Sequence, residues 1–314
     1  MSKYSALINS LKGPVYSIIT PFKKDDQIDF DALEKYLLHL NNCGANIFYA
    51  MAFNSRYSQL THDEILELNK FIIKTVKSIN PKNIIIVADP VTSSTKESLL
   101  FSEQAQSHGA DLISLIFSER VYSHNQVYNH FDFISKKCSL PILLHEMKLV
   151  SGLDGSLVNW DLELLKDVMS IDNLIAIKED AKDEDLFKKI LKIEFNGSII
   201  ISGGGKKRWL SYSDTSCQSW LNGIGTFLPK IPKLFWINYL DGNTKFLTKI
   251  INEIEEPFFN EIVNKFGWHT SARASLHYFG HTEIYERMPM TYLDNNQYNE
   301  VKNFFDKMKL EEFI

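Results

Sequence analysis

A lysine stands at the end of an apolar run in the segment NLIAIKED, residues 173–180. The four residues before Lys178 are all apolar, which is typical of a strand buried on both faces. Burial disfavours the charged form of an amine, so we expect the pKa of Lys178 to be lowered. A neutral amine attacks a carbonyl carbon and forms a Schiff base. The alternative is that Lys178 only satisfies the strand end by pairing with Glu179, Glu146 or Asp180.

A histidine and a glutamate lie near the end of a second apolar run, LPILLHEM (residues 140–147). Histidine gains and loses a proton near neutral pH, so His145 is a candidate proton shuttle. Glu146 would orient His145 or act as a second base. Glu119, which follows another apolar run, could do the same or contact the substrate. With Lys178, these side chains would provide a nucleophile and an acid–base pair.

Two short polar segments follow further apolar runs and could bind a substrate. Asn54 and Ser55 carry hydrogen-bond donors and acceptors, and Arg56 follows them directly. A guanidinium group binds a carboxylate or a phosphate through two hydrogen bonds, so Arg56 or Arg120 is the expected anion contact. The two segments therefore predict part of the polar lining of a substrate pocket.

A run of three glycines, in the segment SGGGKKRW (residues 202–209), precedes a predicted helix. Free backbone N–H groups at a helix start bind anions, so Ser202, Gly203 and Gly204 could hold a carboxylate or phosphate tail of the substrate. The alternative is a tight turn before a solvent-exposed basic helix start. The cations at 206–208 oppose the helix dipole, which favours this alternative.

These residues need a scaffold, and the chain repeats a unit of one short apolar run and one longer amphipathic run. The apolar runs predict eight strands, at residues 14–20, 46–52, 83–90, 110–117, 140–147, 174–179, 197–204 and 222–227. Continuous apolar strands favour a parallel sheet covered on both faces, and eight such units favour a (β/α)8 TIM barrel. We expect the barrel at residues 1–228 and a C-terminal helical region packed on it at residues 229–314. In this fold the active site lies at the carboxyl ends of the strands.

Composition narrows the range of functions. The net charge is −5 over 314 residues, which argues against the basic face that nucleic-acid binding needs, and no apolar run reaches membrane length. The three cysteines are far apart and match no metal or redox spacing. We expect a cytoplasmic protein with no nucleic-acid or membrane partner. We also expect no metal and no organic cofactor, because an imine lysine serves as its own electron sink.

Six segments together resemble the dihydrodipicolinate synthase / N-acetylneuraminate lyase family of class I aldolases. They occur in the family's order and spacing: ITPFKKDDQIDFDAL (19–33), LTHDE (60–64), SHGAD (107–111), LPILLH (140–145), LIAIKE (174–179) and ISGGG (201–205). The resemblance implies a (β/α)8 lyase that binds a 2-oxo acid, usually pyruvate, as an imine on Lys178. It also implies a homotetramer or a homodimer.

The chain departs from the family around that lysine. AFNSR (52–56) stands where the family usually has glycine-threonine-threonine-glycine-glutamate, so Phe53 replaces a threonine of the pair that holds the substrate carboxylate and relays a proton. His145 stands in the place of the family's tyrosine. SER (118–120) replaces a proline-tyrosine-tyrosine run, and Val150 replaces an arginine. The imine lysine is retained while its usual relay and carboxylate clamp are rebuilt or lost.

Two functions of different classes are consistent with this pattern. The first is a Schiff-base lyase, aldolase or dehydratase refitted for another 2-oxo acid or oxo-sugar acid, with Lys178 as nucleophile and His145 as proton shuttle. The second is a catalytically altered or inactive member that serves as a ligand-binding or oligomeric scaffold. A third and narrower hypothesis is an isomerase or dehydratase that docks a phosphorylated sugar on Gly203–Gly205.

Overall fold

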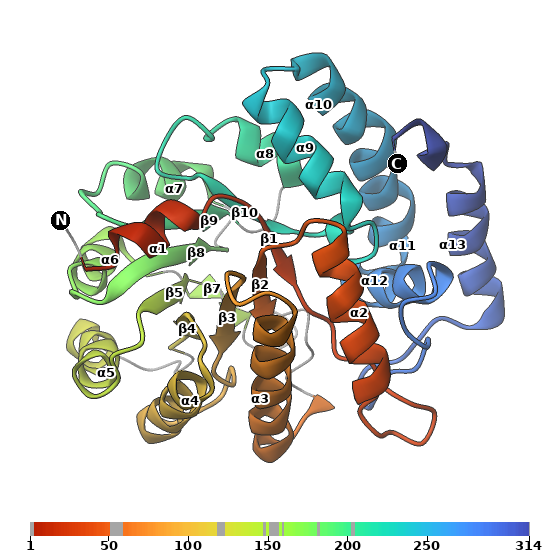
Figure 1. Cartoon of the computed structure of the whole chain (residues 1–314). Helices are drawn as coiled ribbons and strands as arrows, with labels where there is room; N and C mark the ends of the chain where they lie inside the picture. The colour runs from red at the N-terminus through yellow and green to blue at the C-terminus, as the bar shows by residue number, and fades with distance from the viewer. Residues whose placement is uncertain are drawn as a thin grey trace.

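Eight parallel strands close into a barrel at the centre of the molecule (Figure 1). The structure, a computed structural model, describes residues 3–50, 59–117, 123–146, 149–150, 157–158, 160–180, 183–201 and 205–313. The barrel strands are β1 (Gly13–Ser17), β2 (Ile47–Ala50), β3 (Ile84–Ala88), β4 (Leu112–Leu115), β5 (Ile142–Glu146), β8 (Leu174–Glu179), β9 (Ser198–Ile201) and β10 (Ser219–Asn222). Each strand pairs with the next barrel strand in chain order, and β10 pairs with β1, so the predicted (β/α)8 barrel is confirmed.

Helices follow the strands and cover the outside of the barrel (Figure 1). They are α2 (Phe30–Asn42), α3 (His62–Ile79), α4 (Thr95–His108), α5 (His124–Lys137), α6 (Leu162–Met169), α7 (Glu184–Ile190) and α8 (Gly205–Leu210). A short helix, α1 (Ser5–Ser10), precedes the first strand. An antiparallel pair of two-residue strands, β6 (Leu149–Val150) and β7 (Leu157–Val158), lies between β5 and α6 in the chain.

The prediction of the eighth strand at residues 222–227 was wrong. The strand is β10, at Ser219–Asn222, and Ile224–Thr226 form a 3₁₀ turn, η3. The Ser219 hydroxyl donates to the carbonyl of Leu11 at 2.6 Å, which fixes this segment beside the start of β1. A side chain at Gly225 would collide with Asn222, so the apolar run after the strand turns sharply and does not extend it.

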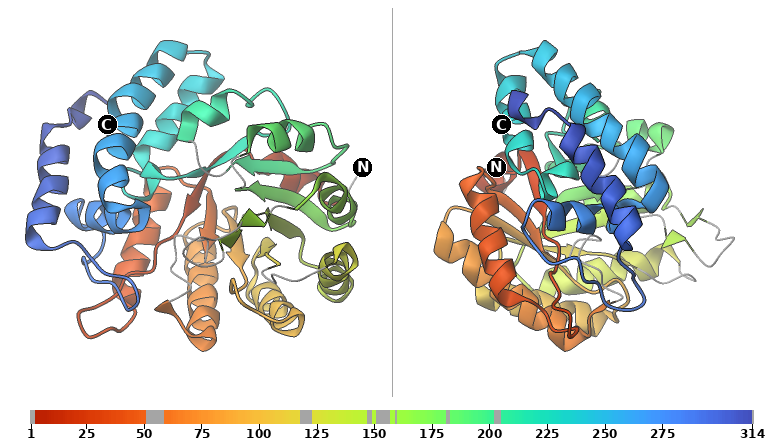
Figure 2. Two further views of the ribbon diagram at one scale, coloured as in Figure 1. Left: turned by 180° about the vertical axis from the view of Figure 1, so that it is seen from behind. Right: turned by 90° about the vertical axis from the view of Figure 1, so that its right-hand side faces the viewer.

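The C-terminal part of the chain is helical. It contains α9 (Lys230–Leu240), α10 (Thr244–Ile250), the π-helical turns η4 (Ile251–Glu255) and η5 (Phe258–Val263), α11 (Asn264–Phe266), α12 (Trp268–Tyr278), α13 (Asn295–Lys307) and the 3₁₀ turn η6 (Leu310–Glu312). These helices lie along one side of the barrel (Figure 2) and share its apolar core, so a division into two regions at residue 229 stays a proposal. No helix in the described part of the chain is long and apolar enough to cross a membrane.

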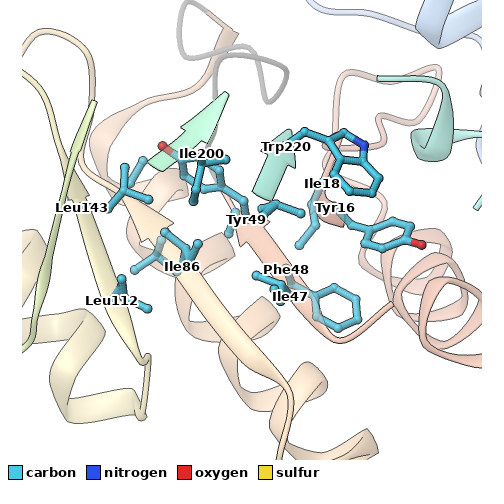
Figure 3. Packing of buried hydrophobic residues seen from close by; sticks show 14 of the residues in the cluster. Tyr16, Ile18, Ile47, Phe48, Tyr49, Ile86, Leu112, Leu143, Ile200 and Trp220 are labelled. Atoms are coloured by element: carbon cyan, nitrogen blue, oxygen red, sulfur yellow. The ribbon is translucent and has the colours of Figure 1, made fainter. Parts of the chain in front are cut away.

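The strands present alternate residues to the interior of the barrel. Figure 3 shows Leu143 on β5 and Ile200 on β9 pointing into the space that the strands enclose. His145 lies two residues after Leu143, and Lys178 is the register partner of Ile200. Because side chains two residues apart on a strand share a face, His145 and Lys178 point into the barrel as well.

Candidate active site

Three polar side chains meet inside the barrel at the carboxyl ends of β5 and β8. The Nζ of Lys178 lies 2.7 Å from Nε2 of His145 and 2.8 Å from Oδ2 of Asp180. The same carboxylate oxygen lies 3.3 Å from Nε2 of His145. Lys178 has no exposed surface, and His145 is 3% exposed. An amine, an imidazole and a carboxylate are therefore within reach of one another. The first two are shielded from bulk water, and the Asp180 side chain is 14% exposed.

The strand register explains why these three residues meet. His145 and Lys178 are partners in the parallel pairing of β5 with β8, so their side chains start side by side. Asp180 comes two residues after Lys178, and side chains two apart in an extended chain share a face. The spacing lysine-x-aspartate at a strand end is the sequence signal for this third member. From the sequence alone, however, Asp180 is only one of several possible partners of the lysine.

Burial and neighbouring charges determine the protonation states of His145 and Asp180. Burial lowers the pKa of His145 to about 4, and the positive charge of Lys178 adds to this, although Asp180 opposes it. His145 is therefore neutral at pH 7. Burial alone would raise the pKa of Asp180, but the charge of Lys178 and hydrogen bonds with both neighbours hold this pKa well below its usual range. The site contains a neutral imidazole that can accept a proton and a carboxylate that balances one positive charge.

The residue between Lys178 and Asp180 is held on the other face of β8. Glu179 has no exposed surface, and its Oε2 accepts a hydrogen bond from Nη1 of Arg208 at 2.8 Å. Arg208, on α8, also donates through Nε to Glu184, the first residue of α7, at 2.5 Å. Arg208 thus ties the end of β8 to both helices that follow it. This contact fixes the backbone that carries Lys178 and Asp180.

The helix after β9 begins against a carboxylate of the protein itself. Glu255 accepts the backbone N–H of Lys206 at 2.8 Å through Oε2 and lies 2.8 Å from its Nζ through Oε1. Gly205 has a φ of 63°, and a side chain there would meet Oε2 of Glu255 at 2.8 Å. Lys206 has no exposed surface, so the expected solvent-exposed basic helix start is wrong for it, as it is for the paired Arg208. An internal anion at this helix start weighs against the phosphate-docking hypothesis.

The other predicted site residues fall outside the described part of the chain. Those without any description are Asn54, Ser55, Arg56, Glu119, Arg120, Ser202, Gly203 and Gly204. Glu146 is the last residue of β5, and only its backbone is described. In the chain these residues end β5 or follow β2, β4 and β9, and their roles stay predictions.

Three cavities found in the described part lie away from Lys178. One lies on the C-terminal helices beside Phe304, one beside Phe195 and one beside Arg287. Among the described residues, no group of three or more His, Cys, Asp or Glu side chains could hold a metal ion. The described side chains around Lys178 are suited to nucleophilic and acid–base chemistry.

Comparison with known proteins agrees with this fold. The model of the dihydrodipicolinate synthetase family matches residues 10–308. The 4-hydroxy-tetrahydrodipicolinate synthase of Oceanobacillus iheyensis is 25% identical over 188 residues, which cover 60% of this chain and 61% of that protein. The enzyme of the same name from Lactobacillus acidophilus is 30% identical over 173 residues, 54% of this chain and 52% of that protein. The matched spans therefore cover less than two thirds of either relative.

Solved structures match over nearly the whole chain. The 4-hydroxy-tetrahydrodipicolinate synthase of Methylacidiphilum fumariolicum SolV has a TM-score of 0.81 at 21% identity, over 96% of this chain and 97% of that one. The dihydrodipicolinate synthase of Thermotoga maritima has a TM-score of 0.81 at 19% identity, over 96% of this chain and 99% of that one. At such identities the likeness shows the fold and leaves the reaction to be argued from the site.

Proposed function

Because the chain belongs to the dihydrodipicolinate synthetase family, we propose that it is a Schiff-base-forming lyase or aldolase, or a dehydratase of the same type. Its substrate is a 2-oxo acid or an oxo-sugar acid, which becomes an imine on Lys178. The observation that carries the proposal is the buried amine of Lys178, 2.7 Å from a neutral imidazole inside the barrel. A buried amine with an adjacent base is the arrangement that nucleophilic catalysis by lysine requires.

The three members of the cluster can share one proton. The ammonium of Lys178 transfers a proton to Nε2 of His145, which leaves a neutral amine and an imidazolium. Asp180 balances the positive charge on either residue, because its carboxylate lies within 3.3 Å of both nitrogens. The net charge of the cluster is the same before and after the transfer, so the step needs no separation of charge.

The amine then forms the imine. Its lone pair attacks the carbonyl carbon, the C–N bond forms as the C=O π bond breaks, and a proton passes from the attacking nitrogen to the oxygen, which becomes a hydroxyl. His145 returns its proton to this hydroxyl, which leaves as water, and the product is a protonated imine paired with Asp180. The imine withdraws electrons from the neighbouring carbons, which permits C–C cleavage, condensation or loss of water. Glu146 is proposed as a second base or orienting group, and the eight undescribed residues named above as substrate contacts.

The test is reductive trapping. The protein is mixed with pyruvate and borohydride, digested, and mapped by mass spectrometry. We expect a reduced pyruvate adduct on Lys178. Lys206 is the internal control, because it is also buried and ion-paired, at 2.8 Å from Glu255, yet its hydrogen-bond partners among the described residues include no imidazole. Absence of an adduct with pyruvate and with every other 2-oxo acid tried would refute the enzymatic proposal.

A second candidate is a non-catalytic ligand-binding or oligomeric protein of the same fold. The ion pair between Lys178 and Asp180 favours it, since an ammonium held by a carboxylate is not itself a nucleophile. The two candidates differ in the effect of Lys178→Ala. A binding protein keeps its affinity for a 2-oxo acid in this variant, whereas an imine enzyme loses both the adduct and turnover.

Assembly and location are proposals as well. A homotetramer or homodimer in the cytoplasm is expected, acting on a small molecule. Sedimentation velocity of the purified chain measures its mass in solution, and a monomer at all concentrations would contradict the expected assembly.

A further inference from the structure

Two buried hydroxyl groups form a pair inside the barrel. The phenol oxygen of Tyr49, on β2, lies 2.6 Å from Oγ of Ser114, on β4. Tyr49 has no exposed surface and Ser114 is 1% exposed. The two strands are not neighbours, because β3 lies between them, so the phenol reaches over β3 from the inner side of the barrel. The interior around them is otherwise largely apolar, as Ile86 and Leu143 show (Figure 3).

The pair lies next to the Lys178 cluster. Ser114 is the register partner of Leu143 on the adjacent strand, about 5 Å away. His145 is the next inward residue after Leu143, roughly 7 Å further along the same strand. The hydroxyl pair is therefore one strand spacing and one inward position from the imidazole that contacts Lys178. The phenol also lies close enough to the cluster for the charge of Asp180 to raise its pKa.

One of the two hydroxyl hydrogens of the pair has no acceptor among the described residues. Two hydroxyl groups carry two hydrogens, and the bond between them uses one. Among the described residues neither Tyr49 nor Ser114 has another side-chain hydrogen-bond partner. A buried donor without an acceptor costs free energy, so this hydrogen is available to an oxygen of a ligand.

The surroundings of the pair determine which kind of ligand oxygen it can bind. Burial raises the pKa of Tyr49, the hydrogen bond from Ser114 lowers it, and the negative charges of Asp89 and Asp180 raise it again, with a net increase. The phenol therefore stays protonated in the working range of pH. The pair is buried in a largely apolar interior, which disfavours an anion, so a neutral hydroxyl oxygen suits the position better than a carboxylate does.

We propose that the Tyr49–Ser114 pair binds a hydroxyl group close to the reacting carbonyl, so that the protein selects a hydroxylated 2-oxo acid over pyruvate. This inference rests on the proposed imine chemistry and names the class of substrate. The pair donates its free hydrogen to the substrate hydroxyl and can accept one in return. Pyruvate, which has a methyl group there, leaves the donor unpaired.

The test compares two small probes, pyruvate and 3-hydroxypyruvate, which differ by one hydroxyl. Each is trapped on Lys178 with cyanoborohydride at a series of concentrations, and the half-saturating concentration is measured by mass spectrometry. We expect the unchanged protein to prefer 3-hydroxypyruvate by about fivefold to tenfold, the effect of one hydrogen bond. In Tyr49→Phe the preference disappears, because only the hydroxyl of nearly the same ring is removed.

Two further variants complete the design. Ser114→Ala breaks the same pair without changing the ring, so it reduces the preference as well. Tyr36→Phe is the matched control, because Tyr36 is a buried phenol that donates to the carbonyl of Thr226 at 2.7 Å, away from the cluster. This control keeps the preference of the unchanged protein, so a loss there would mark a general effect of removing buried phenols and overturn the inference.

The outcomes separate the two proposals. Adducts on Lys178 whose ratio is the same in the unchanged protein, Tyr49→Phe and Ser114→Ala overturn the role of the hydroxyl pair and leave the imine chemistry standing. Absence of adducts on Lys178 with both probes overturns the proposed reaction and this inference together.

Discussion

The side-chain nitrogens of Lys178 and His145 lie 2.7 Å apart across one register pair of β8 and β5. At this distance a proton moves between them directly, with no water as carrier. His145 is neutral at pH 7, so it is ready to receive the proton that makes Lys178 nucleophilic. The resemblance to the family implies that His145 stands in the place of a tyrosine, and the ordinary titration range of histidine is closer to neutrality.

Lys178→Met tests the nucleophile. We expect no reduced adduct with any carbonyl compound, because the amine is gone. The free energy of unfolding should fall by about 3–5 kcal/mol, since the charge of Asp180 loses its 2.8 Å contact with the ammonium. Lys206→Met is the control, because it breaks an equally buried ion pair with Glu255. In urea unfolding, Lys206→Met should lose about as much free energy of unfolding as Lys178→Met does, and it should still form the adduct on Lys178.

The double variant Lys178→Met with Asp180→Asn tests whether the two residues act as a pair. Asp180→Asn removes the carboxylate charge that has lost its lysine contact in the single variant Lys178→Met. We expect the double variant to be less destabilised than the sum of the single ones, with a coupling energy of about 1–3 kcal/mol. Urea unfolding of the four proteins measures it. Additive losses would mean that the 2.8 Å contact contributes nothing to stability.

The stability of the protein should depend on pH through His145. Its pKa is about 4 in the folded protein, against 6.5 as its ordinary value. The unfolded chain therefore binds the proton more strongly, and the stability present above pH 6.5 is lost as the pH falls toward 4. The full effect is about 3 kcal/mol. We expect His145→Gln to lose less stability than the unchanged protein between pH 7 and pH 4.5 in urea unfolding.

Two other histidines titrate in the same pH range without affecting this comparison. Burial also lowers the pKa values of His130, which is buried, and of His281, which is half-buried, to about 4. They are present in both proteins, and their contributions cancel in the difference. Equal pH dependence in both proteins would show that His145 is not the neutral buried base that its surroundings indicate.

Arg208→Met tests how the strand end is held. The variant removes the guanidinium that contacts the buried carboxylate of Glu179 at 2.8 Å, so we expect a loss of about 3–5 kcal/mol in the free energy of unfolding. We also expect trapping on Lys178 to slow by roughly tenfold or more, because Lys178 and Asp180 flank the released residue. Lys207→Met is the control. Lys207 pairs with Glu256 at the surface, and its loss should change the stability by under about 0.5 kcal/mol without affecting trapping.

Inorganic phosphate tests the anion-docking hypothesis. Glu255 already accepts the backbone N–H of Lys206, so we expect millimolar phosphate to leave the melting temperature unchanged. Sodium chloride of the same ionic strength is the control. Protection by phosphate beyond that of the chloride, lost on changing Gly204 to a bulky residue, would revive the sugar-phosphate hypothesis.

Local pattern was enough to predict most of the barrel. Seven barrel strands lie within the predicted apolar runs, or one residue outside them, because a strand covered on both faces is apolar throughout and leaves a clear mark in the sequence. The eighth was misplaced because Ile224 and Phe227 are buried in a turn, and an apolar run does not distinguish a buried turn from a strand. Long-range contacts, such as Ser219 to Leu11, decide between the two.

The sequence by itself determined that a lysine ends an apolar strand and that a histidine and an aspartate are candidates near it. Only the tertiary structure decided which groups meet. His145 is 33 residues from Lys178 in the chain, and their 2.7 Å contact exists because β5 and β8 pair in one register. A shift of that register by one residue would turn one of them out of the barrel. Likewise, only the docked C-terminal helices bring Glu255 to the start of α8, since such contacts depend on packing between segments far apart in the sequence.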